Sequence, residues 1–223
     1  MKIYLADTDP LKNQILFEKM LSQMPSCRKS KVLRMPEGIN RRQSLGAGIL
    51  LSIALSAKGL TEEQTKTGPY GKPYLPEAEQ LFFNLSHSGN RVMCAVADTP
   101  VGCDVQQIRD IPEFGKIAKR FFTPEETAEI ERLPEEEGKE LFFRYWTLKE
   151  SYIKASGMGL SMPLNRFCLR MKEDGSVTLA DSSNDEVAFW ESDSDDGYRY
   201  ACCLLNETAL IKPETEWIDF STC

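Results

Sequence analysis

A carboxylate and an ammonium group stand four residues apart, at Glu150 and Lys154, within the segment Trp-Thr-Leu-Lys-Glu-Ser-Tyr-Ile-Lys of residues 146–154. Residues four apart share one face of a helix, whereas Leu148 and Tyr152 point to the other side. One face is therefore suited to a polar site and the other to a core. The same spacing is also typical of an ordinary surface ion pair worth about 0.2–0.5 kcal/mol, so the rest of the chain must decide between the two.

A second carboxylate, Asp104, lies in a predicted strand over residues 101–106, where alternation places it on the same face as Gln106. Cys103 and Val105 flank Asp104, so we expect its charge to be half buried and to need a partner or a metal ion. A turn-capping role for this aspartate is the alternative interpretation.

His87 is the only histidine of the chain, and it stands in the short polar sequence Ser86-His87-Ser88-Gly89. Small polar neighbours and a glycine suit a loop that contacts a ligand. A purely structural hydrogen-bonding role is the alternative.

The charge distribution indicates a small anionic ligand rather than a nucleic acid. The formal net charge is −7, which argues against nucleic-acid binding. Residues 28–42 nevertheless hold six basic side chains and one acid, Glu37. Such a segment could bind a small polyanion, or it could be a solvated face of a helix and loop.

The elements expected to position these residues follow from periodicity and from turn formers. Strands are predicted over residues 2–6, 81–85, 92–97, 101–106, 166–171, 177–179, 187–191 and 198–205. Helices are predicted over residues 11–24, 41–58 and 111–122, from Thr123 onward, and from Lys139 to about Gly157 after an acidic linker. Between them, the turn-rich segment 67–74 is expected to present Lys72.

Length and composition indicate a soluble protein that stays in the cytoplasm. The chain of 223 residues is long enough for one domain or two modest ones, and 41% hydrophobic with 27% charged residues is ordinary for a globular protein. We expect no signal peptide and no membrane span, because the apolar stretches are too short. The seven cysteines have no zinc-binding spacing, so we expect buried free thiols.

Three segments, in this order, resemble one family: Phe-Asn-Leu-Ser-His-Ser at 83–88, Val-Gly-Cys-Asp at 101–104, and the segment 146–154. Together they are similar to the 4'-phosphopantetheinyl transferases, in particular to the larger, monomeric surfactin-type branch. The resemblance implies an α+β fold of two similar halves, related by a pseudo-twofold axis, with the active site between them. The halves would span residues 1–103 and 104–223.

The reaction that the resemblance implies is transfer of 4'-phosphopantetheine from coenzyme A to a serine of an apo carrier protein, with release of adenosine 3',5'-bisphosphate. A divalent cation such as Mg²⁺ would neutralise the pyrophosphate, with Asp104 and Glu150 as its ligands and Gln106 beside them. Lys154 would contact the same phosphates. Glu150 is also expected to act as the general base, directly or through a metal-bound water.

The resemblance also assigns the residues that would hold coenzyme A. His87 and Ser86 would contact one of its phosphates, and Arg42 and Lys72 would hold the nucleotide end. The basic segment thereby acquires a ligand, the adenosine 3'-phosphate.

The sequence departs from the family pattern at two places. Many relatives carry an acid where this chain has the neutral Gln106, so two carboxylates are expected to hold the metal. Lysines that some relatives place near residue 25 align with Cys27 and Ser30. Their role would then fall to a neighbouring cation, namely Arg28, Lys29 or Lys31.

The expected partner is an acidic carrier protein of fatty-acid, polyketide or nonribosomal-peptide synthesis. Lys116, Lys119 and Arg120, with Phe121 and Phe122 nearby, form a basic and apolar contact suited to it. The alternative function is a non-catalytic module that binds coenzyme A or the carrier on the same fold.

Overall fold

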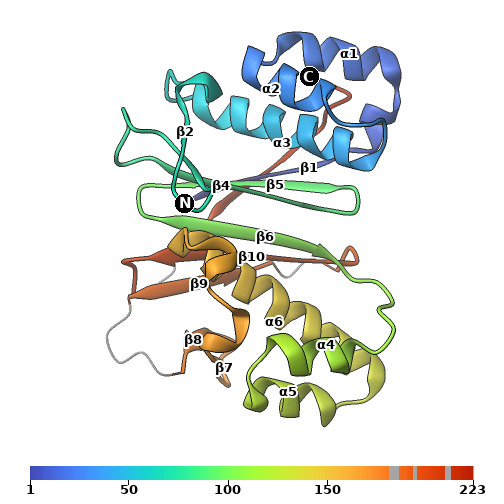
Figure 1. Ribbon diagram of the computed structural model, residues 1–223, viewed down its shortest axis with the longest axis vertical. Coiled ribbons are helices and arrows are strands. Elements are labelled where there is room, and N and C mark those ends of the chain that lie inside the picture. The colour runs from blue at the N-terminus through green and yellow to red at the C-terminus, as the bar shows by residue number, and fades with distance from the viewer. Residues whose placement is uncertain (181–185, 193–194, 209–211, 223) are drawn as a thin grey trace.

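The computed structural model describes residues 1–180, 186–192, 195–208 and 212–222. Figure 1 shows four layers, in which helices cover the outer face of each of two sheets and the sheets lie against each other. The expected α+β fold of two similar halves is confirmed.

The first half contains one sheet and three covering helices. Its elements are β1 (Lys2–Asp7), the 3-10 helix η1 (Asp9–Lys12), α1 (Gln14–Gln23), α2 (Ser26–Leu33), α3 (Ile39–Ser56), η2 (Glu62–Gln64), β2 (Lys66–Thr67), β3 (Pro73–Tyr74), β4 (Phe82–Ser88) and β5 (Arg91–Ala97). The sheet has the order β11-β1-β5-β4, and β2 and β3 form a separate small hairpin. The outermost strand, β11 (Glu214–Ile218), comes from the end of the chain and pairs parallel to β1.

The second half is built around one long helix. Its elements are β6 (Val101–Gln107), α4 (Phe114–Phe121), α5 (Pro124–Glu131), α6 (Glu135–Ser156), η3 (Gly159–Ser161), η4 (Leu164–Arg166), β7 (Leu169–Met171), β8 (Val177–Leu179), β9 (Val187–Glu191) and β10 (Tyr198–Leu205). Its sheet has the order β6-β10-β9, and β7 pairs only with β8. Helix α6 ends at Gly157, whose left-handed φ of 71° suits glycine.

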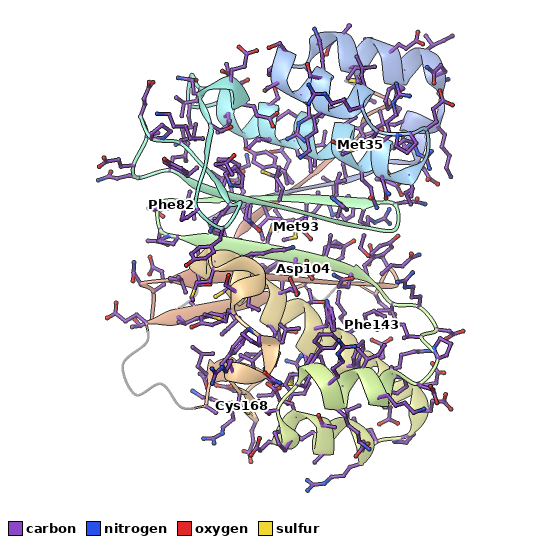
Figure 2. The ribbon with its side chains drawn as sticks, in the orientation of Figure 1. Met35, Phe82, Met93, Asp104, Phe143 and Cys168 are labelled. Atoms are coloured by element: carbon purple, nitrogen blue, oxygen red, sulfur yellow. The ribbon has the colours of Figure 1, made fainter. Side chains whose placement is uncertain are left out.

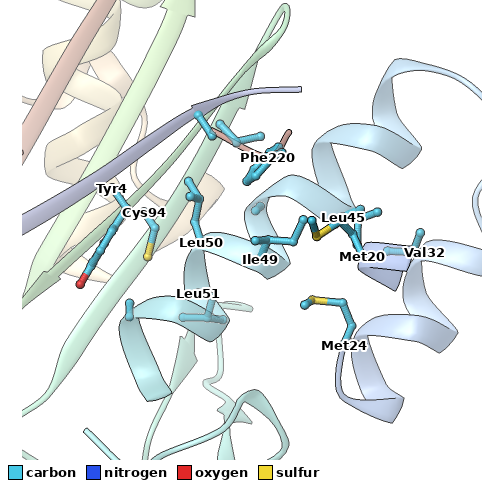
Figure 3. Close-up of a cluster of buried hydrophobic side chains, with 14 of the residues drawn as sticks. Tyr4, Met20, Met24, Val32, Leu45, Ile49, Leu50, Leu51, Cys94 and Phe220 are labelled. Carbon is cyan, nitrogen blue, oxygen red and sulfur yellow. The ribbon is translucent and has the colours of Figure 1, made fainter. Parts of the chain in front are cut away.

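Three apolar clusters hold the layers together. The first lies between α1–α3 and the first sheet, where Leu45, Ile49 and Leu50 of α3 meet Tyr4 and Cys94 of the strands (Figure 3). The second fills the space between the two sheets, and the third lies between α4–α6 and the second sheet. Successive side chains of a strand point to opposite faces of its sheet. On β4 and β6, the polar residues that belong to none of the three clusters can therefore form a polar site.

Gly102 lets α6 approach β6 more closely than any side chain would allow. A Cβ atom at this position would lie 2.0 Å from the Ser151 carbonyl oxygen and 2.2 Å from the Ala155 amide nitrogen. The helix backbone therefore rests directly on the strand. This contact sets the distance between the α6 side chains and those of β6.

Most of the predicted elements are confirmed, with the following exceptions. Ser86, His87 and Ser88 were expected in a loop, but β4 continues to Ser88 because these residues pair with β5. The segment 67–74, expected to be a loop, begins and ends in the short strands β2 and β3. The prediction of an acidic linker at 134–138 is wrong, because Pro134 is the N-cap of α6 and Glu135–Glu137 form the first turn of this helix. Acidic side chains there stabilise the positive end of the helix dipole. Helix α2 and strand β11 were not predicted. The division at 103/104 stays a prediction, and within the described residues this point falls inside β6.

Among the described residues, no helix is both long and apolar enough to cross a membrane. Cys94, Cys103, Cys202 and Cys203 are buried as free thiols, as expected, whereas Cys27 is exposed.

Candidate functional site

Asp104, Ser86 and Lys154 meet where β4, β6 and α6 come together. The Lys154 ammonium donates to Asp104 Oδ1 over 2.6 Å and to Ser86 Oγ over 3.0 Å, and Ser86 Oγ donates to the same carboxylate oxygen over 2.8 Å. Figure 2 places Asp104 close to the boundary between the two halves. Asp104 is only 2% exposed, so its charge is buried further than the sequence predicted and has the partner it requires.

Gln106 contacts the second oxygen of the same carboxylate. Its amide nitrogen donates to Asp104 Oδ2 over 3.0 Å, and its carbonyl oxygen accepts a long hydrogen bond of 3.5 Å from Ser88. A metal ion needs the carbonyl oxygen rather than the amide nitrogen, so this orientation makes Gln106 a hydrogen-bond donor to Asp104. Its role as a metal ligand stays a prediction.

Glu150 lies on the same helix as Lys154, one turn toward the N-terminus. Burial, and then the negative charge of Asp104, raise the pKa of Glu150 above its usual value, while Lys154 acts in the opposite direction. Burial, the largest single influence, would lower the pKa of Lys154, but the charge and hydrogen bond of Asp104 together with the other neighbouring groups, Glu150 among them, outweigh it, so the pKa of Lys154 is raised. The charge of Asp104 thus disfavours ionisation of Glu150, and Lys154 remains charged beside both carboxylates.

Oxygen donors suited to a hard cation are therefore available at Asp104 and Glu150. Mg²⁺ uses one or two carboxylates and completes its shell with water and substrate phosphates. In the described part of the chain, no group of three or more His, Cys, Asp or Glu side chains forms a complete protein cage for a metal. Asp104 and Glu150 match, in number and type, the one or two carboxylates that Mg²⁺ uses at such a site.

His87 stands in an electropositive environment. Burial, followed by the positive charges of Lys154 and Lys31, lowers the pKa of His87 below its ordinary value of 6.5. Within the basic segment 28–42, Lys31 is thus the residue whose charge lowers the pKa of His87. Arg28 is committed elsewhere, since its guanidinium is buried and binds the Glu62 carboxylate over 2.5 Å and 2.9 Å.

Arg42 lies in the first turn of α3 and lines a small cavity of about 160 Å³. Its Nε atom is buried and has no hydrogen-bond partner in the structure. A buried donor without a partner is costly, so an acceptor from a ligand would be favourable there.

Lys72 connects the two halves. Its ammonium donates to the Val101 carbonyl over 2.9 Å and to the Ala155 carbonyl, at the C-terminal end of α6, over 3.1 Å. To contact a nucleotide, the amine would have to leave these carbonyls, so its assignment to coenzyme A stays a prediction. Burial lowers the pKa of Lys72 to about 8.

We expect the stability contribution of Lys72 to rise with pH between about 8 and 10.5. In this range the unfolded chain binds the proton and the folded chain has lost it, because the ordinary value is 10.5, so stability increases as pH rises. Urea unfolding at pH 7.5 and 9.5 tests this. The difference in unfolding free energy between the wild type and Lys72→Met should grow in favour of the wild type at the higher pH. The exposed Lys66→Met is the matched control, and its difference from the wild type should be the same at both pH values. A growth of the same size for both variants would contradict the assignment.

A largely apolar groove of about 530 Å³ opens beside Glu150 and Lys154. Its walls come from the end of α4, from α6 and from the segment after α6, and they include Arg120, Phe121, Trp146, Ile153, Gly159, Met162, Pro163, Leu164 and Asn165. The reactive side chains therefore stand at the edge of an apolar channel rather than in open solvent.

Two polar side chains of the site were not singled out from the sequence. Asn84 is buried, and its Oδ1 accepts a 2.9 Å hydrogen bond from the Cys103 amide across the two halves. Ser88 Oγ accepts from the Gln107 amide over 3.1 Å. Both share a strand face with Ser86 at a spacing of two residues, and this alternation of polar residues was the available signal.

Comparison with known proteins agrees with this geometry. Residues 100–203 match the family model described as the 4'-phosphopantetheinyl transferase superfamily. A 4'-phosphopantetheinyl transferase of Bacillus subtilis is 33% identical over 210 residues, which cover 92% of this chain and 93% of the relative. A second, psf-1 of Bacillus pumilus, is 34% identical over 82% of this chain and 77% of its own length.

Among solved structures, a holo-(acyl-carrier-protein) synthase from Bacillus anthracis str. Ames in complex with CoA (3',5'-ADP) matches 49% of this chain and 96% of its own, at 22% identity and a TM-score of 0.44. The sequence relatives extend over both halves and over all of the motifs that meet between β4, β6 and α6. By this similarity the chain belongs to the 4'-phosphopantetheinyl transferase superfamily.

Proposed function

We propose that the protein transfers 4'-phosphopantetheine from coenzyme A to a serine hydroxyl of an apo carrier protein. The observation that carries this proposal is the meeting of Asp104, Ser86 and Lys154 beside Glu150 at the edge of the apolar groove. A non-catalytic binding module would not need a buried aspartate and a half-buried glutamate next to a charged lysine.

Coenzyme A would lie with its phosphates between the halves. Lys154 and Ser86 meet between β4 and α6 and would contact the pyrophosphate. His87, whose pKa is lowered by the charges of Lys154 and Lys31, would contact a phosphate as well. Arg42 with Lys31 would neutralise the 3'-phosphate. Lysine and arginine each suit phosphate, as a point charge and as a planar fork respectively. The positive charge gathered there explains why an acidic protein binds a polyanion.

In the transfer, the serine oxygen forms a bond to the phosphorus that carries pantetheine, and the bond from that phosphorus to the adenosine-bearing phosphate breaks. The serine proton passes to Glu150, whose raised pKa suits a general base. Lys154 stabilises the charge on the leaving adenosine 3',5'-bisphosphate. Mg²⁺, held by Asp104 and Glu150 with Gln106 alongside, would supply charge neutralisation on the pyrophosphate oxygens.

The transfer itself is tested by intact-mass measurement. Incubation with coenzyme A, Mg²⁺ and an apo carrier should raise the mass of the carrier by one phosphopantetheine group. A panel of fatty-acid, polyketide and nonribosomal-peptide carriers at one coenzyme A concentration would also identify the pathway. Unchanged masses across the panel would refute the proposal.

The carrier is proposed to dock over α4, next to the groove. Lys116 and Lys119 are exposed at this surface, and the Arg120 guanidinium lies 5.2 Å from the ring centroid of Phe121. Such a surface complements the acidic face of a carrier protein. The proposed site residues all come from one chain, which supports a monomer. The buried free thiols support a cytoplasmic location.

Charge reversal at Lys119 and Arg120 is expected to raise the KM for the carrier by about tenfold, since losing complementary charge slows encounter and weakens docking. The affinity for coenzyme A should not change. Steady-state kinetics with each substrate varied in turn measures both quantities. Lys172→Glu, an exposed reversal in the turn between β7 and β8, is the control, and equal effects on both substrates would argue against this docking surface.

A further inference from the structure

Lys149 is next to Glu150 in sequence, about 100° further round α6, and it is fully buried. Its ammonium lies 2.8 Å from Glu126 Oε1 and donates to the carbonyl oxygens of Leu164 and Phe167 over 2.9 Å and 2.5 Å. It also lies 4.3 Å from the ring centroid of Phe167. A charge this deeply buried is tolerated only with such a complete set of partners.

Glu126 extends the same network to a third segment. Its Oε2 accepts from the Thr123 amide over 3.0 Å at the start of α5, and its Oε1 accepts from the Leu169 amide over 2.8 Å. Lys149 and Glu126 together therefore join the middle of α6, the first turn of α5 and both ends of the segment 164–169.

The segment held in this way begins in one wall of the apolar groove. Leu164 and Asn165 line the groove together with the preceding Met162 and Pro163, and Glu150 and Lys154 line the same groove. The wall has little other support from regular structure, since η3 and η4 are single short turns. The same ammonium also lies 5.9 Å from the ring centroid of Phe122, which follows the groove residue Phe121 in sequence.

We propose that Lys149 is a positioning residue, which with Glu126 fixes the width of the groove beside Glu150 and thereby the approach of the carrier serine. This inference rests on the proposed function. Lys149 touches neither substrate, because its side chain is fully buried and does not line the groove. Its effect is carried by the wall at 162–165. Of the cations proposed for coenzyme A, Arg42 and Lys31 lie on other elements, and Lys154 of the same helix is held separately by Asp104 and Ser86.

Removing Lys149 alone would leave the Glu126 carboxylate buried without a cation, which endangers folding. The informative variant is Lys149→Met/Glu126→Gln. It removes both charges at nearly constant volume, and the new amide can accept from one of the two backbone amides and donate to a freed carbonyl. The matched control is Arg144→Met/Glu191→Gln, which neutralises another ion pair of the same helix, at 2.7 Å, away from the groove.

Hydrogen exchange followed by mass spectrometry should show faster exchange at residues 162–169 in the test variant and unchanged exchange in the first half. The kcat/KM for the carrier should fall on the order of tenfold, since small misplacements away from the chemistry reach 10²-fold, while coenzyme A affinity by calorimetry stays the same. The control variant should show neither effect.

Unchanged exchange at 162–169, or an equal loss of affinity for coenzyme A, would overturn the inference. A wild type that modifies no carrier would instead refute the proposed function, and the exchange measurement would still decide whether Lys149 holds the wall.

Discussion

Replacing Glu150 by glutamine is expected to lower the transfer rate on the order of 10²–10⁴-fold, the usual contribution of a general base. The amide keeps the volume and hydrogen-bonding reach of the side chain but accepts no proton. Because Gln106 brings no charge to the site, half of the carboxylate charge near the proposed metal is lost as well. Mg²⁺ binding, measured by calorimetry in the presence of coenzyme A, should weaken together with the rate.

The control for this substitution is Glu137→Gln, an exposed position in the first turn of the same helix, which should leave transfer unchanged. A Glu150→Gln enzyme that is slow but has normal Mg²⁺ dependence would restrict Glu150 to the role of base. If the wild type and the variant were equally without turnover while coenzyme A still bound, the non-catalytic module would be the correct function.

Gly102→Ala should have the largest effect on folding, a loss of about 3 kcal/mol, at the upper end of the usual range for overpacking a rigid contact. The added Cβ would meet backbone atoms of Ser151 and Ala155 at 2.0 and 2.2 Å, and backbone has no alternative rotamer. Helix α6 must then move away from β6, which separates Lys154 from Asp104. Urea unfolding and transfer activity of the same preparation should both be reduced.

Gly115→Ala is the matched control, because a Cβ there meets nothing within 4 Å and alanine favours the helix by roughly 0.5–1 kcal/mol. Stability equal to that of the wild type in Gly102→Ala would show that the helix and strand are not in direct backbone contact.

The residues that carry the chemistry could be predicted from the sequence because each lies in a short local pattern. Glu150 and Lys154 are one helical turn apart, and Asp104 with Gln106 alternate on one strand. Such patterns depend on backbone geometry over a few residues. Their meeting between β4, β6 and α6 came from the family resemblance rather than from the spacing.

Other contacts left no local trace. Lys72 was predicted in an exposed loop, but its ammonium reaches carbonyls 29 and 83 residues further along the chain. The partners of Lys149 likewise lie 15 residues or more away. Strand β11 was missed because four of its five residues are exposed, so it lacks the alternation that marks a half-buried strand. In each case the decisive interaction depends on tertiary packing.

The parallel pairing of β11 with β1 makes the two halves mutually dependent. The chain leaves the first half at β6 and returns to it near its end. There, β11 pairs with β1, Lys2 forms ion pairs with Glu214 and Glu216, and Phe220 joins the apolar cluster of the first half. A cut in the exposed turn between β7 and β8 would therefore leave two fragments that still share a sheet. Conversely, a chain shortened before residue 214 would bare the edge of β1, and an uncovered edge strand is a template for self-association. Strand β11 thus both joins the end of the second half to the first sheet and covers an edge that would otherwise promote aggregation.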